Sequence, residues 1–214
     1  MPDFALERGC DGLVCGIDEA GRGPLAGPVV AASVILDRKK IPRRLRNELD
    51  DSKKLNAEER DEFALMIRQC AIKIGVGAAS VREIERINIL QATFVAMRRA
   101  LMQMGVMPDI ALIDGNQPPP LPCAVKTVIG GDGLSLSIAA ASVIAKTTRD
   151  RLMRALALRY DGYGWMTNVG YATEEHRAAI LSLGPTRHHR MTFAPLQLSL
   201  AFDANLIDQV PLTP

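Results

Sequence analysis

The stretch Gly16-Ile17-Asp18-Glu19-Ala20-Gly21-Arg22-Gly23-Pro24 ends an apolar run with two adjacent carboxylates and continues into a loop rich in glycine and proline. The preceding run, residues 13–17, has the composition of a buried strand. Adjacent strand residues point to opposite faces of a sheet, so Asp18 and Glu19 share a ligand only where the backbone bends or one carboxylate lies at an edge. The glycines permit such a bend. The stretch therefore predicts an acidic site at a strand end, beside a tightly shaped loop.

The composition is typical of a globular domain without a strong overall charge. Of the 214 residues, 48% are hydrophobic and 23% are charged, and this length suffices for one sizeable domain. The formal charge of +2 comes from 26 basic and 24 acidic side chains. Because no basic field covers the whole chain, a site for a polyanion has to come from local clustering.

The cysteines and the apolar runs indicate the cellular compartment to expect. The four cysteines form no Cys-x-x-Cys pair and lie far from the three histidines, so neither a zinc site nor a disulfide framework is expected. Apolar runs fall short of the roughly 18 residues that a membrane span needs, and residues 1–4 lack the basic start of a signal peptide. We therefore expect a cytoplasmic monomer without a membrane partner.

Strand-like and helix-like segments alternate along the chain. Asn56 followed by Glu59 predicts a capping box, and Thr173 predicts a further helix cap. We expect a glycine, tyrosine and tryptophan loop at 160–172. The alternation predicts an α/β sheet with helices on its faces. Strands are expected at 12–18, 28–36, 72–80, 110–113 and 124–129, and helices at 56–70, 81–104, 134–159 and from 174.

Four carboxylates share one local setting at strand ends or beside them. Asp18 and Glu19 end one strand, Asp114 ends another, and Asp132 lies in a glycine turn before a helix. Strand ends are where α/β sheets bind ligands. Acids gathered there repel one another, and a divalent cation relieves the repulsion. The alternative is that the aspartates belong to ordinary turns and that Glu19 is a capping or solvated residue.

The donor set favours Mg²⁺ or Mn²⁺ over zinc, because it consists of carboxylates without histidine or cysteine. Two such ions about 4 Å apart clamp the attacking and leaving oxygens of a phosphodiester. The chemistry that the pattern indicates is therefore phosphoester hydrolysis.

Successive motifs between residues 12 and 195 resemble those of bacterial ribonuclease HII, the type 2 ribonuclease H, and occur in the order of that family. The motifs are Gly16–Pro24, Asp51–Leu55, Ile113–Gly115, Gly131–Asp132, Ala140–Arg151 and Gly170–Thr173. The resemblance implies a ribonuclease H-like fold, with a mixed sheet flanked by helices and a small helical C-terminal part from about residue 150. It implies a catalytic domain over 1–195. Beyond it the sequence is loosely patterned and ends in Pro211–Pro214, so we expect a mobile tail over 196–214.

The resemblance also implies the roles of site residues. Asp18, Glu19, Asp114 and Asp132 would bind the metal ions, two with substrate bound. Gly21, Arg22 and Gly23 would contact the ribonucleotide 2′-hydroxyl at an RNA-to-DNA junction, and Tyr171 would stack on the sugar of the next deoxynucleotide. The implied activity is hydrolysis of the RNA strand of RNA/DNA hybrids and incision 5′ to single ribonucleotides in duplex DNA. The chain departs from the commoner family pattern at Gly133, Val169 and Ala172.

Two rival functions stay open at this point. A related nuclease could act on hybrids without cutting at single ribonucleotides, but the loop Gly21-Arg22-Gly23 disfavours it. A catalytically silent hybrid-binding module is disfavoured by the four acids, since clustered negative charge near phosphates gives a binder nothing.

Other polar residues have both a binding and a structural interpretation. Lys53, Lys54, Lys146 and Arg149 could hold backbone phosphates, whereas a lysine pair is otherwise a solvated face. Asn88 could bind a phosphate or be an ordinary helix residue. For Trp165 we favour a packing role over stacking on a base. For His188 and His189 we favour a solvated loop over contact with nucleic acid.

The tail sequence Gln197-Leu198-Ser199-Leu200-Ala201-Phe202 resembles the short peptide by which bacterial replication and repair proteins bind the sliding clamp. The alternative is a terminal segment that packs on its own domain. Clamp peptides are short, so this match is less specific than the catalytic motifs.

Overall fold

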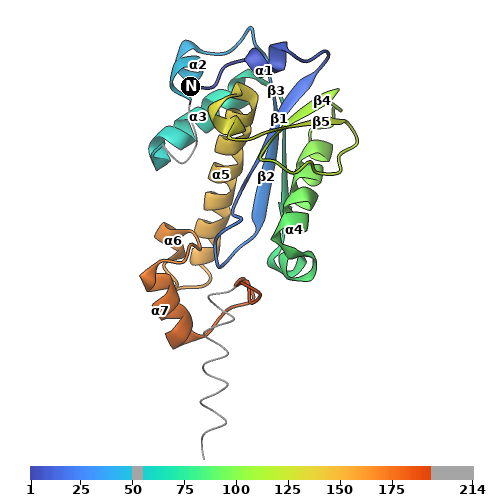
Figure 1. Ribbon diagram of the computed structural model, residues 1–214. Helices are drawn as coiled ribbons and strands as arrows, with labels where there is room; N and C mark the ends of the chain where they lie inside the picture. The colour runs from blue at the N-terminus through green and yellow to red at the C-terminus, as the bar shows by residue number, and fades with distance from the viewer. Residues whose placement is uncertain (50–54, 194–214) are drawn as a thin grey trace, which may run out of the picture.

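The computed structural model describes residues 1–49 and 55–193, and in this part of the chain five strands form a mixed sheet (Figure 1). The strand order is β3-β2-β1-β4-β5. The first three strands in the sequence pair antiparallel, while β1, β4 and β5 run parallel. The predicted α/β class is confirmed. The strands are β1 Val14–Ala20, β2 Val29–Leu36, β3 Ala71–Ala79, β4 Ile110–Asp114 and β5 Ala124–Val128.

Helices cover both faces of this sheet. Helix α4 packs against β1, β2 and β3 on one face, and α5 packs against β1 and β2 on the other, beside α3 (Figure 1). Helices α6 and α7 lie at the far end of α5 and form the small C-terminal part. The helices are α1 Ala5–Arg8, α2 Arg43–Glu48, α3 Ala57–Cys70, α4 Val81–Gln103, α5 Leu136–Ala157, α6 Trp165–Asn168 and α7 Glu174–Leu183, with a 3₁₀ turn at Gly131–Gly133.

The short helices depart from the sequence-based expectation. The prediction of a loop over 160–172 was wrong for α6, and α1 and α2 were not predicted. Helices of four to six residues have little intrinsic stability and depend on tertiary packing. Leu45 of α2 and Trp165 of α6 are buried, at 0% and 1% exposure, so each short helix is held by a core side chain.

The predicted helix caps are confirmed. The side chain of Asn56 accepts a hydrogen bond from the amide of Glu59 at 2.9 Å, and the Glu59 carboxylate accepts one from the amide of Asn56 at 2.8 Å. Thr173 accepts from the amide of His176 at 3.2 Å. These bonds satisfy amide groups that a helix N-terminus leaves without partners.

Helix α4 is interrupted at Asn88, contrary to the continuous helix expected over 81–104. Asn88 has φ 65° and ψ 167°, outside the helical region. Its side-chain oxygen accepts a hydrogen bond from the amide of Gln91 at 3.1 Å. Asn88 therefore caps the second part of α4, so the interpretation of this residue as an ordinary helix residue was wrong.

Alternation along β1 sends its two acidic residues to opposite faces of the sheet. Gly16 approaches α5 so closely that a Cβ there would lie 2.1 Å from the backbone of Ser137. Asp18 shares that α5 face. Ile17 packs in the core formed with α4, and Glu19 shares the α4 face.

The start of α5 is anchored by the N-terminal segment. Glu7 is 1% exposed, and its Oε1 atom accepts hydrogen bonds from the hydroxyl of Ser135 at 2.7 Å and the amide of Ser137 at 3.0 Å. Ser135 in turn caps α5 by accepting from the amide of Ile138. These contacts fix the chain directly after the turn that carries Asp132.

Among the helices of residues 1–49 and 55–193, none has the length and apolar character of a membrane span.

Candidate metal centre and substrate cleft

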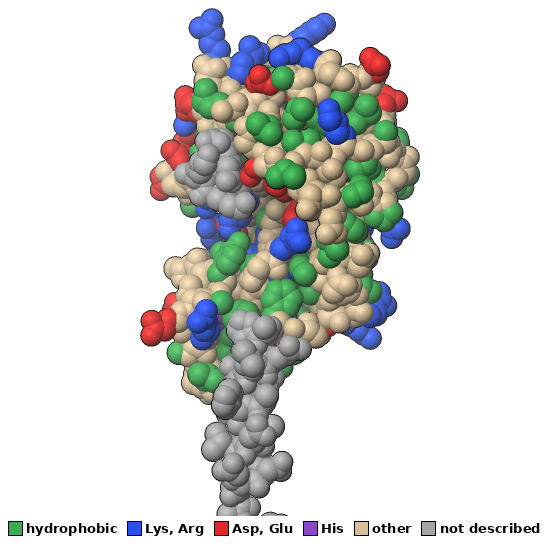
Figure 2. Space-filling view, viewed as in Figure 1, with side chains coloured by type: hydrophobic (Ala, Val, Ile, Leu, Met, Phe, Trp, Pro, Cys, Tyr) green, Lys and Arg blue, Asp and Glu red, His purple; other side chains and the backbone are tan. Residues whose placement is uncertain are grey.

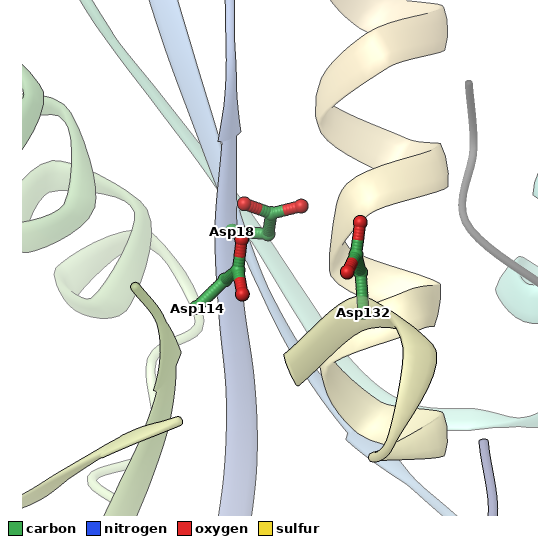
Figure 3. A group of neighbouring side chains, drawn as sticks. All are labelled: Asp18, Asp114 and Asp132. Atoms are coloured by element: carbon green, nitrogen blue, oxygen red, sulfur yellow. The ribbon is translucent and has the colours of Figure 1, made fainter. Parts of the chain in front are cut away.

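Three of the four predicted acids meet at one point of the structure. Asp18 extends from β1, Asp114 is the last residue of β4, and Asp132 lies in the 3₁₀ turn before α5. Figure 3 shows their carboxylates pointing toward one another, and one oxygen of each lies within 4.8 Å of the others. Asp18 therefore joins a single acidic cluster with two aspartates that lie more than 90 residues further along the chain.

Backbone amides orient these carboxylates. Asp114 accepts a hydrogen bond from the amide of Gly131 at 2.7 Å, which ties the end of β4 to the turn that carries Asp132. Asp18 accepts from the amide of Glu19 at 2.7 Å, and Asp132 accepts from the amide of its neighbour Gly133 at 2.9 Å.

Burial and like charge perturb the central acid. The pKa of Asp18 is raised well above its usual range, chiefly because the carboxyl is buried and also because Glu19 and Asp114 lie close to it. A hydrogen bond with the Ser142 side chain opposes this shift. Such an oxygen-rich, partly repulsive cluster is suited to a hard divalent cation.

Ser142 was not singled out from the sequence, although it lies within the motif Ala140–Arg151. It is on α5, and it lines the cleft together with Lys146, which is four residues further along the helix. The helical spacing of these two polar residues in an otherwise buried, alanine-rich segment is the signal that could have identified Ser142.

Glu19 lies beside the three aspartates and interacts with the loop that follows β1. Its Oε1 atom is 3.1 Å from Nη1 of Arg22, and its side chain is 12% exposed. Its Oε2 atom is buried and has no hydrogen-bond partner among the described residues. Burial raises the pKa of Glu19, and Arg22 opposes the shift. A role for Glu19 as a metal ligand stays a prediction.

A cleft of about 200 Å³ adjoins the acidic cluster, and it is lined by several of the predicted substrate-binding residues. Figure 2 shows this face hollowed between the sheet region and the C-terminal helices, with acidic and basic side chains in the hollow. Lys146 donates to Asp150 at 2.8 Å, and its ammonium lies 5.5 Å from the centre of the Tyr171 ring. The lining residues are Glu19, Ala20, Gly21, Arg22, Gly23, Ser142, Lys146 and Tyr171.

A buried aromatic and histidine network holds the backbone of Tyr171. Nδ1 of His176 is 2.8 Å from the carbonyl oxygen of Tyr171 and therefore donates a proton to it. Nε2 of His176 then accepts from Nε1 of Trp165 at 2.9 Å. Burial lowers the pKa of His176, and burial with the nearby His176 lowers the pKa of His189 to about 4. Both rings are neutral near pH 7, and Trp165 packs in the core as expected.

The solvated loop favoured for the two histidines is wrong for His189, which is 1% exposed. His188 also has aromatic neighbours: its ring centroid lies 4.8 Å from that of Tyr160. Val169 adopts a left-handed backbone with φ 43°. Its carbonyl accepts a hydrogen bond from Arg149 at 3.0 Å.

Some predicted binding residues lie outside the described part of the chain: Lys53, Lys54 and the peptide 197–202.

A mixed sheet with aspartates from β1, β4 and the turn before α5 defines a nuclease centre of the ribonuclease H-like class. The family model for ribonuclease HII matches residues 15–196. The ribonuclease HII of Paramagnetospirillum magneticum is 58% identical over 202 residues, which cover 94% of this chain and 100% of that relative.

Solved structures give the same result for the fold. The ribonuclease H2 of Pyrococcus horikoshii OT3 matches with a TM-score of 0.70 and 26% identity, covering 86% of this chain and 95% of that one. The Archaeoglobus fulgidus RNase HII, solved in a complex with PCNA, matches with a TM-score of 0.68 and 27% identity, covering 85% and 95% of the two chains.

The chain belongs to the ribonuclease HII family. It is therefore a ribonuclease H, an endonuclease of the hydrolase class that cleaves the RNA strand of RNA/DNA hybrids in a metal-dependent reaction.

We expect Asp18→Asn to raise the melting temperature of the metal-free protein near neutral pH by at least about 2 °C. The folded-state pKa of Asp18 lies above its value of about 3.9 in an unfolded chain. The wild type therefore loses stability as the pH rises from about 4 through the folded-state pKa, and an amide at this position does not. Thermal unfolding in EDTA at several pH values measures this difference, which should shrink toward pH 4.

The exposed Asp11 provides a matched control, because Asp11→Asn removes one carboxylate outside the cluster. Mn²⁺ should raise the melting temperature of the wild type and of the Asp11 variant more than that of Asp18→Asn. A variant at Asp18 that is less stable than the wild type in EDTA at every pH would contradict the repulsive cluster.

Proposed function

We propose that this protein also cuts duplex DNA on the 5′ side of single embedded ribonucleotides, leaving a 5′-phosphate and a 3′-hydroxyl. It would serve ribonucleotide removal during replication and repair in the cytoplasm. The observation that carries the proposal is the shared cleft: the loop Gly21-Arg22-Gly23 and the ring of Tyr171 line it beside Ser142, whose side chain interacts with Asp18.

The acidic cluster fits one or two Mg²⁺ or Mn²⁺ ions in its donor chemistry. Asp18, Asp114 and Asp132 offer carboxylate oxygens within 4.8 Å of one another, and the unpartnered Oε2 of Glu19 is a further candidate donor. When bound, such ions activate water and stabilise the leaving 3′-oxygen. Ser142 and the backbone amides hold the aspartates in place.

The cleft offers separate groups for the sugar and the phosphate. A Cβ built on Gly23 would meet no atom within 4 Å, so a sugar can approach the backbone there. The 2′-hydroxyl distinguishes RNA from DNA, and backbone groups of the loop can hydrogen-bond to it. Tyr171 is 42% exposed, which leaves ring surface for stacking on the next sugar. Lys146 can contact a phosphate.

The two rivals predict different products. A nuclease restricted to hybrids would leave a single embedded ribonucleotide uncut, and a silent binder would not gather three aspartates beside a phosphate site. Cleavage of a single set of substrates therefore distinguishes both rivals from the proposed function.

The decisive experiment is cleavage of a labelled DNA duplex that contains one ribonucleotide, with Mg²⁺, Mn²⁺ or EDTA. We expect the wild type to make a single metal-dependent cut on the 5′ side of the ribonucleotide. Asp18→Asn should reduce the rate at least about 100-fold, because the central carboxylate is lost. Cleavage of a long hybrid without this cut would support the first rival, and tight binding without any cut would support the second.

The two loop glycines should respond differently to alanine. Gly21 has φ +93°, and a Cβ there would lie 2.0 Å from Nε of Arg149, so Gly21→Ala should destabilise the protein by more than about 1 kcal/mol. Gly23→Ala should change the unfolding free energy by less than about 0.5 kcal/mol. Its methyl group should nevertheless lower cleavage at a single ribonucleotide about tenfold or more, because it occupies the cleft.

Urea unfolding and initial cleavage rates measure the two effects separately. Gly105→Ala is a control for strain alone, because Gly105 has φ +67° and a Cβ there would meet no atom within 4 Å. Normal cleavage by a stable Gly23→Ala variant would show that this face of the loop does not contact the substrate.

We also propose that residues 197–202 bind the sliding clamp. The Archaeoglobus fulgidus RNase HII in a complex with PCNA supports a clamp partner for this family. Deleting residues 197–214 should abolish binding to the bacterial clamp in a pull-down assay and leave cleavage of a short duplex unchanged. Unchanged clamp binding after the deletion would exclude this peptide, and the double change Leu200→Ala with Phe202→Ala tests the same contact without truncation.

A further inference from the structure

Two arginines are completely buried beneath the loop that follows β1. Arg149 of α5 and Arg190 are both 0% exposed. Within the described residues, neither guanidinium lies within 4.0 Å of a carboxylate oxygen. Burying a cation without an acidic partner costs free energy of folding. The hydrogen bonds that the two guanidinium groups do make have to offset this cost.

Arg190 binds backbone carbonyls at both ends of this loop. Its Nη1 atom donates to the carbonyl of Arg22 at 2.9 Å, and its Nη2 atom donates to the carbonyl of Gly21 at 2.6 Å. Nε and Nη2 also donate to the carbonyl of Gly27, at 3.0 and 2.8 Å. The ring of Phe193 covers the guanidinium at 5.0 Å. The planar fork of an arginine suits this set of acceptors, and an ammonium does not reproduce it.

Arg149 holds the neighbouring part of the chain in the same way. It donates to the carbonyls of Ala26 and Pro28 at 3.0 and 3.1 Å, and to that of Val169 at 3.0 Å. Arg149 therefore binds the end of the loop, whereas Arg190 joins its end to its beginning. Burial and the nearby Arg149 lower the pKa of Arg190 to about 9, so it is still charged near neutral pH.

The orientation of the peptide planes follows from these contacts. In a trans peptide the N–H group points away from the carbonyl of the same plane. Because the carbonyls of Gly21 and Arg22 point to the buried Arg190, the amides of Arg22 and Gly23 point in the opposite direction. These residues line the cleft, and neither amide donates to a protein acceptor within the described chain.

We propose that Arg190 is a positioning residue for ribonucleotide recognition: it fixes two peptide planes so that the amides of Arg22 and Gly23 are presented to the 2′-oxygen of the substrate. Arg190 does not touch the substrate. The inference rests on the proposed incision at single ribonucleotides and names the residue that shapes its recognition loop.

The test is the preference for ribonucleotide in binding, measured without cleavage. In an Asp18→Asn background, the dissociation constants are compared for a DNA duplex with one ribonucleotide and for the same duplex made only of DNA. Arg190→Lys keeps the charge and loses the fork, and it should reduce the preference about tenfold, as expected for one misplaced hydrogen bond. The exposed Arg187 gives the matched control, because Arg187→Lys should keep the preference.

Two further measurements separate positioning from general stability. With Asp18 intact, Arg190→Lys should retain the increase in melting temperature caused by Mn²⁺, because the acidic cluster is made by other segments. In the ¹⁵N-labelled Asp18→Asn protein, the amide signals of Arg22 and Gly23 should shift with the ribonucleotide duplex more than with the DNA duplex, and this readout does not depend on whether an arginine variant folds.

The outcomes test the role of Arg190 separately from the proposed function. An unchanged preference in Arg190→Lys, a parallel loss of preference and Mn²⁺ response, or unshifted amide signals would overturn the role of Arg190 alone. If the Asp18→Asn parent itself shows no preference for the ribonucleotide, and the wild type makes no cut there, the proposed function fails instead.

Discussion

Carboxylates gathered at the ends of β1 and β4 repel one another, and the packing around them has to offset this repulsion. Asp18 is buried, and its pKa is raised by burial and by its acidic neighbours, so the folded chain holds this cluster at a cost in stability. The parallel pairing of Ile17 with Ile113 brings Asp114 beside it, and the hydrogen bond from Gly131 to Asp114 brings the turn with Asp132. Helices packed on both faces of the sheet offset this cost, and a divalent cation removes its cause.

The alternation of the strand divides the site between two faces. Asp18 faces α5, where Ser142 and Asp132 complete the cluster, whereas Glu19 faces α4 and interacts with Arg22. Asp114 reaches both groups because it ends its strand. A regular β1 therefore explains why two adjacent acids do not have identical surroundings, and why Glu19 retains a buried oxygen without a partner among the described residues.

The elements that the sequence predicted correctly are those that interactions between nearby residues determine. The strands, the long helices and the caps at Asn56 and Thr173 follow from apolar periodicity and from the hydrogen bonds of nearby side chains. The three aspartates could be named from their places at strand ends and from the family resemblance. Glu7 could not be found in this way, because it bonds to Ser137, 130 residues further along the chain.

The break of α4 at Asn88 and the short helix around Trp165 depend on such tertiary context too. Ser142 is an intermediate case, because a helical pattern was visible around it but its partner Asp18 belongs to a distant strand.

The two buried arginines leave the negative charge of the acidic cluster unneutralised. An arginine placed next to Asp18 would neutralise the acidic cluster and compete with a metal ion for its oxygens. Arg149 and Arg190 are instead satisfied by backbone carbonyls of the loop that begins at Gly21. Their hydrogen bonds are met without consuming a carboxylate, so the negative charge of the cluster stays available to cations.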